Sequence, residues 1–329
     1  MAVLVCGGAG YIGSHAVVQL LDENEEVIVV DNLEKGYNEA ILAGASFYHG
    51  DLRSQQFIDQ VFEENRIDSV IHFAGNSLVG ESVMDPLKYY DNNISSTISL
   101  LRAMAKYDVK DIVFSSTAAV YGEPEQIPVS EDAQTLPTNP YGETKLAIEK
   151  MLKWSERAYG IRYVSLRYFN VAGADPLGRI GEDHRPETHL IPIVLEVAQG
   201  KREKVMIYGD DYSTNDGTCI RDYIHVNDLV GAHLLAIKKL KKSRESAVYN
   251  LGNGKGFSVK EVIDVARKVT NHSIPTEIAP RRAGDPAKLV ASSKKAVREL
   301  GWEPGYADLE TIIQTAWTWF QNNPHGYSK

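Results

Sequence analysis

Three side chains near the middle of the sequence have the types and the spacing of an acid–base centre. Tyr141 and Lys145 are four residues apart in a segment with helical spacing, so a helix there places the phenol and the ammonium group on one face. A β-rich run over 111–117 ends in hydroxyl residues, the last of which is Thr117. A phenol with an ordinary pKa near ~10 is a poor base unless nearby positive charge favours the phenolate. We expect these three residues to be catalytic; the alternative is a surface tyrosine on an amphipathic helix.

A glycine-rich turn near the N-terminus could hold a cofactor beside this centre. Residues 3–13 begin as an apolar run, short enough for a buried strand, and lead directly into Gly7, Gly10 and Gly13, after which apolar positions recur at helical spacing. Glycines at these positions permit a tight turn and let backbone N–H groups approach a pyrophosphate at a helix N-terminus. The pattern alone also fits an ordinary glycine-rich loop, so the residues that follow decide between the two.

Acidic residues follow the next two predicted strands. The apolar run 27–30 ends at Asp31, where a dinucleotide fold places the acid that binds the adenosine ribose. Because a carboxylate there would repel a 2′-phosphate, Asp31 followed by Asn32 favours NAD over NADP. Residues 45–52 predict a third strand, and Asp51 at its end either contacts adenine or caps the next helix.

Strands and helices continue to alternate through the first half of the chain. A fourth strand is predicted over 69–75, one amphipathic helix over 85–107, with Asn92 inside it, and a fifth strand over 111–117. Such alternation predicts an α/β fold, a Rossmann-type doubly wound parallel sheet, and ligands bind such sheets beyond the carboxyl ends of the strands.

The alternation breaks near residue 170, which suggests two domains. We expect residues 1–170 to form an NAD-binding domain and residues 171–329 to form mainly a smaller C-terminal α/β substrate domain, with segments near 222–252 returning to the first. Residues 258–261 fit a capping box, and 309–320 read as a core helix.

Two arginines in the second half are candidate phosphate ligands. The guanidinium groups of Arg221 and Arg282 could pair bidentately with the oxygens of a diphosphate. The alternative is that they form ion pairs with Asp222 and Asp285.

Composition excludes several classes of function. The formal net charge of −9, without a long basic block, argues against a nucleic-acid or anionic-membrane partner, and no apolar run approaches the length of a membrane span. The chain enters a strand at once, without a signal segment, and two cysteines give no disulfide framework, so a cytoplasmic location is expected. The nine histidines are scattered without close His or Cys partners at zinc-binding spacings, so we expect no metal site.

Several motifs together resemble a known family. Residues 7–13, 73–75, 89–93, 115–122 and 141–145 are similar to the extended short-chain dehydrogenase/reductase family. Residues 166–174, 181–183, 216–226 and 281–285 resemble the NAD-dependent nucleotide-sugar epimerases of that family, and the resemblance covers nearly the whole chain.

The resemblance implies site residues beyond those named above. It implies a catalytic role for Thr117, Tyr141 and Lys145, with NAD as the cofactor and a UDP-hexose as the substrate. The implied cofactor-binding residues are Gly7, Gly10, Tyr11, Ile12, Gly13, Asp31, Asn32, Asp51, Leu52, Phe73, Ala74, Gly75, Asn92, Tyr141, Lys145 and Phe169. The implied substrate-binding residues are Thr117, Tyr141, Asn170, Arg221, Arg282 and Asp285.

The resemblance also implies the reaction and its alternatives. It implies interconversion of UDP-glucose and UDP-galactose by a homodimer, through transient oxidation at sugar C4, rotation of the 4-keto sugar and return of the hydride. A 4,6-dehydratase would need an acid pair where this chain has Ala118 and Ala119. A 4-epimerase of UDP-N-acetylhexosamine or UDP-uronic acid stays open, because residues 286–289 lack the bulky tyrosine that some members have nearby. A non-catalytic NAD-binding regulatory protein is the alternative from a different class.

Overall fold

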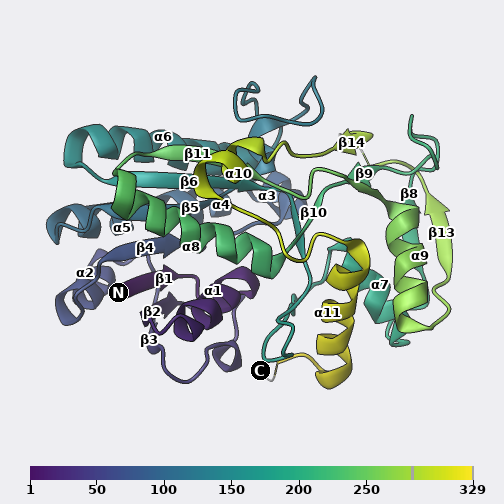
Figure 1. Ribbon diagram of the computed structural model, residues 1–329, viewed down its shortest axis with the longest axis horizontal. Helices are drawn as coiled ribbons and strands as arrows, with labels where there is room; N and C mark the ends of the chain where they lie inside the picture. Colours follow the sequence, from purple (N-terminus) through teal and green to yellow (C-terminus); the bar gives the residue numbers. More distant parts are fainter. Residues whose placement is uncertain (283–284, 328–329) are drawn as a thin grey trace.

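The computed structural model describes residues 1–282 and 285–327, and its centre is a seven-stranded sheet (Figure 1). Residues 283 and 284, part of the motif at 281–285, lie outside the described residues. All neighbouring strands in this sheet pair in parallel. Their order is β11 (Ala247–Leu251), β6 (Arg162–Tyr168), β5 (Asp111–Thr117), β4 (Ser69–His72), β1 (Ala2–Cys6), β2 (Glu26–Asp31) and β3 (Ser46–His49).

Helices cover both faces of this sheet. One face packs against α1 (Tyr11–Asp22), α8 (Val226–Ser243) and α10 (Lys294–Leu300). The other packs against α2 (Gln55–Glu64), α5 (Ser96–Lys106) and α6 (Pro140–Tyr159). Strands buried on both faces explain the nearly continuous apolar runs in the sequence, since every residue of β1 and of β5 is buried. The doubly wound α/β prediction is confirmed, and strand order reverses between β1 and β4, where such sheets bind ligands.

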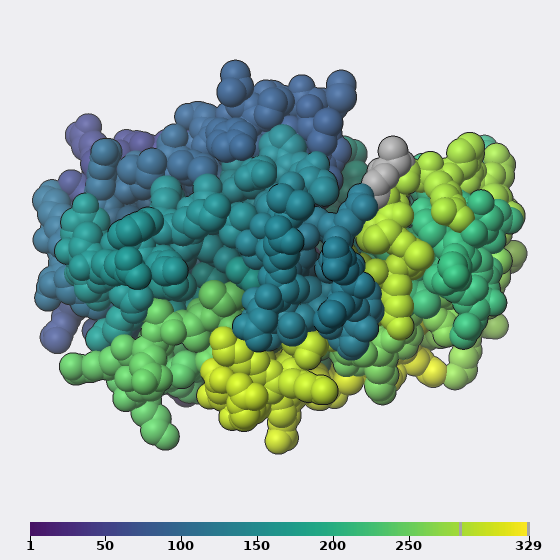
Figure 2. Space-filling model, turned by 90° about the horizontal axis from the view of Figure 1, so that it is seen from above, coloured from purple at the N-terminus to yellow at the C-terminus, as the bar shows by residue number. Residues whose placement is uncertain are grey.

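Part of the second half of the chain lies against the first half. Strand β11 pairs with β6 in parallel, and α8 packs beside α1 over β5 and β6. In the space-filling view, green and yellow residues from late in the chain lie against the blue and teal surface of the first half (Figure 2). The edge of the large sheet is therefore built by residues far apart in the sequence.

The remaining elements of the second half gather at one end of the molecule (Figure 1). Those that pack around a separate apolar core are α7 (Leu190–Ala198), β8 (Val205–Tyr208), α9 (Val259–Thr270) and α11 (Leu309–Asn322). Strand β13 (Thr276–Ala279) pairs with β8 in parallel. Small sheets join β7 (Asn170–Ala172) with β10 (Tyr223–His225), and β12 (Phe257–Ser258) with β9 (Ile220–Arg221) and β14 (Lys288–Leu289).

Two local predictions in this part of the chain are confirmed. Ser258 and Glu261 form a complete capping box at the start of α9, and Trp317 of α11 is buried in the second core. Within residues 1–282 and 285–327, every helix is too short or too polar to span a bilayer.

The prediction of one helix over 85–107 is confirmed in its extent, because residues 86–106 are helical without a break, but the middle of this helix is π-helical. A short α3 (Val79–Met84) precedes it, and the segment itself divides into α4 (Pro86–Tyr89), a π-helical stretch (Tyr90–Ser95) and α5. The spacing of apolar residues does not distinguish a π-helical turn from an α-helical one, because both bury one stripe. Widened turns of this kind are frequent at functional sites, and this stretch carries Asn92.

Candidate active site

The glycine turn between β1 and α1 leaves no room for side chains at its two ends. A Cβ on Gly7, where φ is +81°, would lie 2.6 Å from the backbone nitrogen of Ala74. A Cβ on Gly13 would lie 2.0 Å from the carbonyl oxygen of Gly7. Gly10, the N-cap of α1, makes no side-chain cap, and the first turn of α1 carries no acid. The free N–H groups and the positive end of the helix dipole therefore suit a pyrophosphate.

A cavity of about 120 Å³ opens at this turn, over the carboxyl ends of β1, β2 and β4. It brings together many of the predicted cofactor residues from segments distant in sequence. Those that line it are Gly7, Gly10, Asp31, Asn32, Asp51, Leu52, Phe73, Ala74, Gly75 and Asn92. The lining also includes Val30, Glu34, Lys35, Gly36, Gly50, Asn76 and Ser96, which were not among the predicted cofactor residues.

The carboxylate of Asp31 is fixed at the edge of this cavity by the backbone. Its Oδ2 accepts a hydrogen bond from the N–H of Ala9 at 3.0 Å, and its Oδ1 accepts one from Leu33 at 2.8 Å. Burial raises the pKa of Asp31, and these hydrogen bonds act in the opposite direction. The group is oriented and retains lone pairs for a ligand, as binding to ribose hydroxyls requires. The cradle and this acid fit an NAD molecule.

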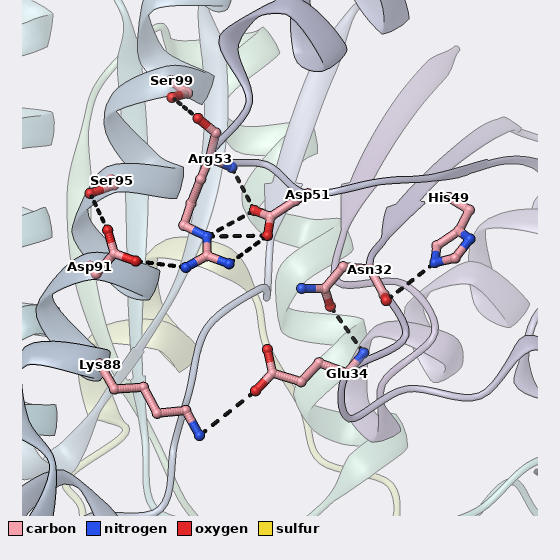
Figure 3. A network of polar contacts seen from close by, with 9 residues as sticks. All are labelled: Asn32, Glu34, His49, Asp51, Arg53, Lys88, Asp91, Ser95 and Ser99. Atoms are coloured by element: carbon pink, nitrogen blue, oxygen red, sulfur yellow. Dashed lines mark hydrogen bonds and ion pairs between the residues drawn. The ribbon is translucent and has the colours of Figure 1, made fainter.

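Figure 3 shows how Arg53 holds Asp51, which lines the cavity. Arg53 donates to Asp51 through Nε at 3.1 Å and Nη2 at 2.7 Å, and through Nη1 to Asp91 at 2.6 Å. These hydrogen bonds hold the pKa of Asp51 below its ordinary value. The N-cap of α2 is Ser54, whose hydroxyl accepts from Phe57, so the alternative role of Asp51 as a helix cap is wrong.

The structure brings Thr117, Tyr141 and Lys145 together. Thr117 ends β5, while Tyr141 and Lys145 lie in the first turns of α6; all three are buried. Helix α6 begins at this point because Asn139 caps it, accepting from Gly142 at 2.9 Å, and Pro140 occupies its first turn. The Thr117 side chain lies near enough to the Tyr141 hydroxyl to act on its pKa, in the downward direction.

Lys145 is held by the end of the same strand. Its Nζ donates to the carbonyl oxygen of Ser115 at 2.9 Å and lies 6.0 Å from the centre of the Tyr141 ring. Burial lowers the pKa of Lys145 to about 8. The ammonium group is thus oriented by backbone rather than by a carboxylate.

The prediction that Lys145 and a bound nicotinamide ring favour the phenolate of Tyr141 concerns the site with its cofactor and stays a prediction. In the protein alone, burial raises the pKa of Tyr141, and the nearby Thr117 side chain acts in the opposite direction. The reason is desolvation, which disfavours a buried phenolate more than the surrounding groups stabilise it. Positive charge from a bound cofactor is needed to shift the balance.

Asn93, next to the predicted Asn92, is a positioning residue that sequence reasoning missed. Its Oδ1 accepts from the N–H of Asn76 at 2.7 Å, and its Nδ2 donates to the carbonyl oxygen of Asn76 at 3.1 Å and to Thr144 at 3.0 Å. The side chain thereby ties the loop after β4 to α6, between the cavity and Lys145. The sequence did offer one indication of this role, because Asn92 and Asn93 are adjacent amide side chains within the predicted helix.

Four predicted cofactor residues lie outside the lining of this cavity, apart from the catalytic pair. Tyr11 donates through its hydroxyl to the carbonyl oxygen of Gly173 at 2.6 Å, and Ile12 packs against the sheet core. Gly13 provides the close contact described above, and Phe169 packs in an apolar cluster with Ala118 and Leu146. Their contacts here are with protein, and their roles toward a cofactor stay predictions.

The predicted substrate residues are only partly brought together. Arg221 donates through Nη2 to Asp285 at 2.7 Å, the ion pair anticipated as the alternative. Arg282 lies over the Tyr208 ring, 4.0 Å from its centre. Asn170 is exposed and lies in β7, where it pairs in register with Tyr223 of β10.

Asp222 was the other expected partner of Arg221, and that expectation is wrong. Its carboxylate is buried and accepts hydrogen bonds from the N–H groups of Asn253, Gly254 and Ala291. Asp222 lies between β9 and β10, and these three backbone contacts occupy the carboxylate that the alternative assigned to an arginine.

His184 and His189 lie close together in the structure. The rings of His184 and His189 lie 5.1 Å apart in the segment before α7. Their spacing matches neither of the zinc-binding motifs that we considered.

Comparison with known proteins agrees with this geometry. The model of the NAD dependent epimerase/dehydratase family matches residues 3–252. A relative from Halalkalibacterium halodurans named UDP-glucose 4-epimerase is 65% identical over 328 residues, 100% of this chain and 98% of the relative.

Two solved structures extend the comparison. UDP-glucose 4-epimerase from Bifidobacterium longum, in complex with NAD⁺ and UDP, matches with a TM-score of 0.94 and 43% identity, over 99% of this chain and 100% of that one. The UDP-Glc/GlcNAc 4-epimerase from Campylobacter jejuni matches with a TM-score of 0.86 and 45% identity, over 98% of this chain and 99% of that one. With a cradle for NAD, a tyrosine–lysine pair beside it and relatives over its whole length, the chain belongs to the NAD dependent epimerase/dehydratase family.

Proposed function

We propose that this protein interconverts UDP-glucose and UDP-galactose with NAD as a resident cofactor. The observation that carries the proposal is the gathering of three buried side chains near the glycine-turn cavity: Thr117 at the end of β5, Tyr141 in the first turn of α6 and Lys145 one turn further along. The relatives named UDP-glucose 4-epimerase supply the sugar nucleotide.

The chemistry of the sugar explains why a redox cofactor is needed. The hydrogen on C4 of a hexose has no adjacent carbonyl to acidify it, so direct removal of a proton from carbon faces a high barrier. Bound NAD supplies a hydride acceptor at C4 that later returns the hydride to the other face. The sugar passes through a 4-keto form and turns over between the two transfers.

The residues of this chain move and hold the proton. Tyr141 takes the proton of the 4-hydroxyl group and returns it, while Thr117 hydrogen-bonds the C4 oxygen. Lys145, fixed by the carbonyl oxygen of Ser115, contributes positive charge beside the phenol and binds the nicotinamide ribose. Because Tyr141 is buried, its proton passes to the sugar rather than to water.

The UDP end must be held firmly while the sugar turns. We assign the diphosphate to Arg221 and Arg282, and contacts with the nucleotide sugar to Asn170 and Asp285. Asp285 keeps the guanidinium of Arg221 extended through the 2.7 Å ion pair. In this assignment residues 1–170 hold the cofactor and 171–329 mainly hold the substrate. We also propose a homodimer in the cytoplasm; light scattering of the purified protein measures the mass of the assembly.

A second substrate class is favoured by one observation. Leu289 in β14 lies in the segment where some members carry a bulky tyrosine that limits the size of the sugar, and one structural relative is named for both UDP-Glc and UDP-GlcNAc. Acceptance of UDP-N-acetylhexosamine is therefore the main alternative, ahead of a UDP-uronic acid. A regulatory NAD-binding protein would have no need of the intact Thr117, Tyr141 and Lys145.

The test is a comparison of rates on two substrates. We expect the purified protein to contain NAD and to convert UDP-galactose to UDP-glucose, with UDP-N-acetylgalactosamine turned over more slowly. Faster turnover of the acetylated sugar would assign the alternative. No turnover of either sugar by NAD-containing protein would overturn the proposal.

A further inference from the structure

The segment between β7 and α7 gathers four metal-ligating side chains away from the cofactor cavity. Glu182, His184, Glu187 and His189 each offer one ligand atom, and these four atoms all lie within 4.8 Å of one another. We call these residues the His–Glu cluster. The epimerisation proposed above uses none of these four side chains.

The distances inside the cluster are those of ligands around a small ion. Glu182 Oε1 lies 3.0 Å from His184 Nδ1 and 3.1 Å from His189 Nδ1. Glu187 lies 2.9 Å from His189 Nδ1 through Oε1 and 3.7 Å from His184 Nδ1 through Oε2. Zinc bonds of about 2.0–2.1 Å in a tetrahedron place neighbouring ligand atoms about 3.3 Å apart. The cluster therefore needs little rearrangement to surround one ion.

Two further contacts prepare the ligand atoms. His184 Nδ1 is buried and makes no hydrogen bond of adequate geometry with the described residues, although Glu182 Oε1 is close. The carboxylate of Glu187 is oriented by its own backbone, because Oε1 accepts from the N–H groups of Thr188 and His189, both at 2.7 Å. Fixed carboxylates and an unsatisfied imidazole nitrogen are what a built metal site requires.

The charges of the cluster also call for a divalent cation. The side chains of Glu182 and Glu187 are each only 5% exposed, and two buried negative charges this close need compensation. One divalent ion supplies two positive charges and leaves both imidazoles neutral. Two protonated histidines would supply the same charge, so the competing reading is an ion-pair network without metal.

A route for the ion exists from solvent. A cavity of about 370 Å³ is lined by Glu182, His184 and Glu187 together with residues 319–320 and 323–326. His189 is the most accessible ligand, with 44% of its side chain exposed. His184 in turn meets the edge of Tyr11, with ring centres 6.1 Å apart, directly after the cofactor turn.

From this geometry we propose that the His–Glu cluster binds one divalent transition-metal ion, with Zn²⁺ the best match to two imidazole nitrogens and two carboxylate oxygens. Four protein ligands leave no open position, so the role is structural. The ion fixes the position of the segment 182–189 between α1 and the C-terminal residues.

The test uses the full-length protein without a histidine tag, stripped with a chelator and titrated with Co²⁺ or Zn²⁺. We expect one equivalent of either metal per chain after gel filtration, measured by elemental analysis. Bound Co²⁺ should give the intense visible absorption of a tetrahedral site. Zn²⁺ should also raise the Tm of the stripped protein.

Variants separate the cluster from adventitious binding. We expect His184→Ala/His189→Ala to bind no stoichiometric Co²⁺ and to lose the Tm response to Zn²⁺, while its circular dichroism checks that it folds. His272→Ala removes an exposed histidine outside the cluster and should behave as wild type. Wild-type protein that holds no stoichiometric metal, or a double variant that keeps the Co²⁺ absorption, would overturn the proposal.

Discussion

Helix α6 carries two buried charges one turn apart, and their surroundings are opposite. Lys145 is 4% exposed, its Nζ donates to a backbone carbonyl, and within the described residues no carboxylate lies within 4.0 Å of it. Glu149 is 7% exposed and is fully paired: Arg167 donates to both of its oxygens, at 2.9 and 2.6 Å, and Ser116 donates at 2.6 Å.

The difference teaches which charge serves the fold and which serves the reaction. The bidentate pair of Glu149 with Arg167 fixes α6 on β6, and that contact positions the first turns of the same helix. Lys145 lacks such a partner, so burial costs stability and lowers its pKa to about 8. A buried ion without a counter-ion is typical of a site that a ligand completes.

The largest effect on turnover is expected from a change of Tyr141, the proposed base beside Lys145. Tyr141→Phe removes the proton acceptor but keeps the ring, so we expect turnover to fall by about 10²–10⁴-fold or more while NAD stays bound. Steady-state rates and the NAD content of the purified variant measure this. Near-normal turnover would rule out Tyr141 as the base.

Loss of the Glu149–Arg167 pair should reduce the stability of the protein. Arg167→Met leaves the carboxylate of Glu149 buried without its counter-ion, and we expect the free energy of unfolding to drop by about 3–5 kcal/mol. Urea unfolding measures it. The double variant Glu149→Leu/Arg167→Met should recover much of the loss; equal stabilities of the single and double variants would show that the unpaired charge is not the cause.

Replacement of the unpaired Lys145 should make the protein more stable and less active. Lys145→Met keeps the length of the side chain and removes the buried cation, so we expect cofactor-free protein to become more stable by roughly 2–3 kcal/mol at pH 7. Turnover should fall at the same time, because the phenol loses its neighbouring charge. If Lys145→Met were less stable than wild type at neutral pH, the buried ammonium group would not be what lowers stability.

The pH dependence of that gain follows from the lowered pKa. Below pH 8 the folded and unfolded chains both carry the Lys145 proton, so the full penalty is present. Between the folded pKa of about 8 and the ordinary lysine pKa of 10.5, the unfolded chain binds more protons and wild-type stability rises with pH. The difference between Lys145→Met and wild type should therefore shrink from pH 8 to pH 10, as unfolding at both values measures.

The smallest effect on stability is expected at an exposed pair. Arg53 and Asp51 have side chains 40% and 37% exposed, so Arg53→Ala should change the free energy of unfolding by no more than about 1 kcal/mol. Affinity for NAD should weaken instead, because Asp51 loses its orientation in the cavity lining (Figure 3). If Arg53→Ala lost as much unfolding free energy as Arg167→Met, burial would not explain the difference between the Arg53–Asp51 and Arg167–Glu149 pairs.

The sheet and the cofactor cradle were predictable because they are local in sequence. Apolar runs of strand length, the glycines at 7–13 and the acid at Asp31 follow one another along the chain, and parallel topology places their ends at one edge. The pair of Tyr141 and Lys145 was found for the same reason, since helical spacing fixes their common face.

Other features depend on contacts that sequence spacing does not encode. The bond of Asn93 to the backbone of Asn76 requires the π-helical stretch, whose wider turn leaves the same apolar stripe as an α-helix. The pairing of Arg221 with Asp285 joins residues far apart in the chain. The His–Glu cluster lies in a segment without helix or strand, where no regular repeat indicates which side chains converge.

The most direct test of the proposed reaction follows the hydrogen on the sugar. UDP-galactose carrying deuterium at C4 is converted by the purified protein in ordinary water, and the UDP-glucose formed is analysed by NMR and mass spectrometry. Because the hydride returns to the carbon that it left, we predict that deuterium stays at C4. Loss of the label to solvent during turnover would contradict transient oxidation and show that the carbon is deprotonated instead.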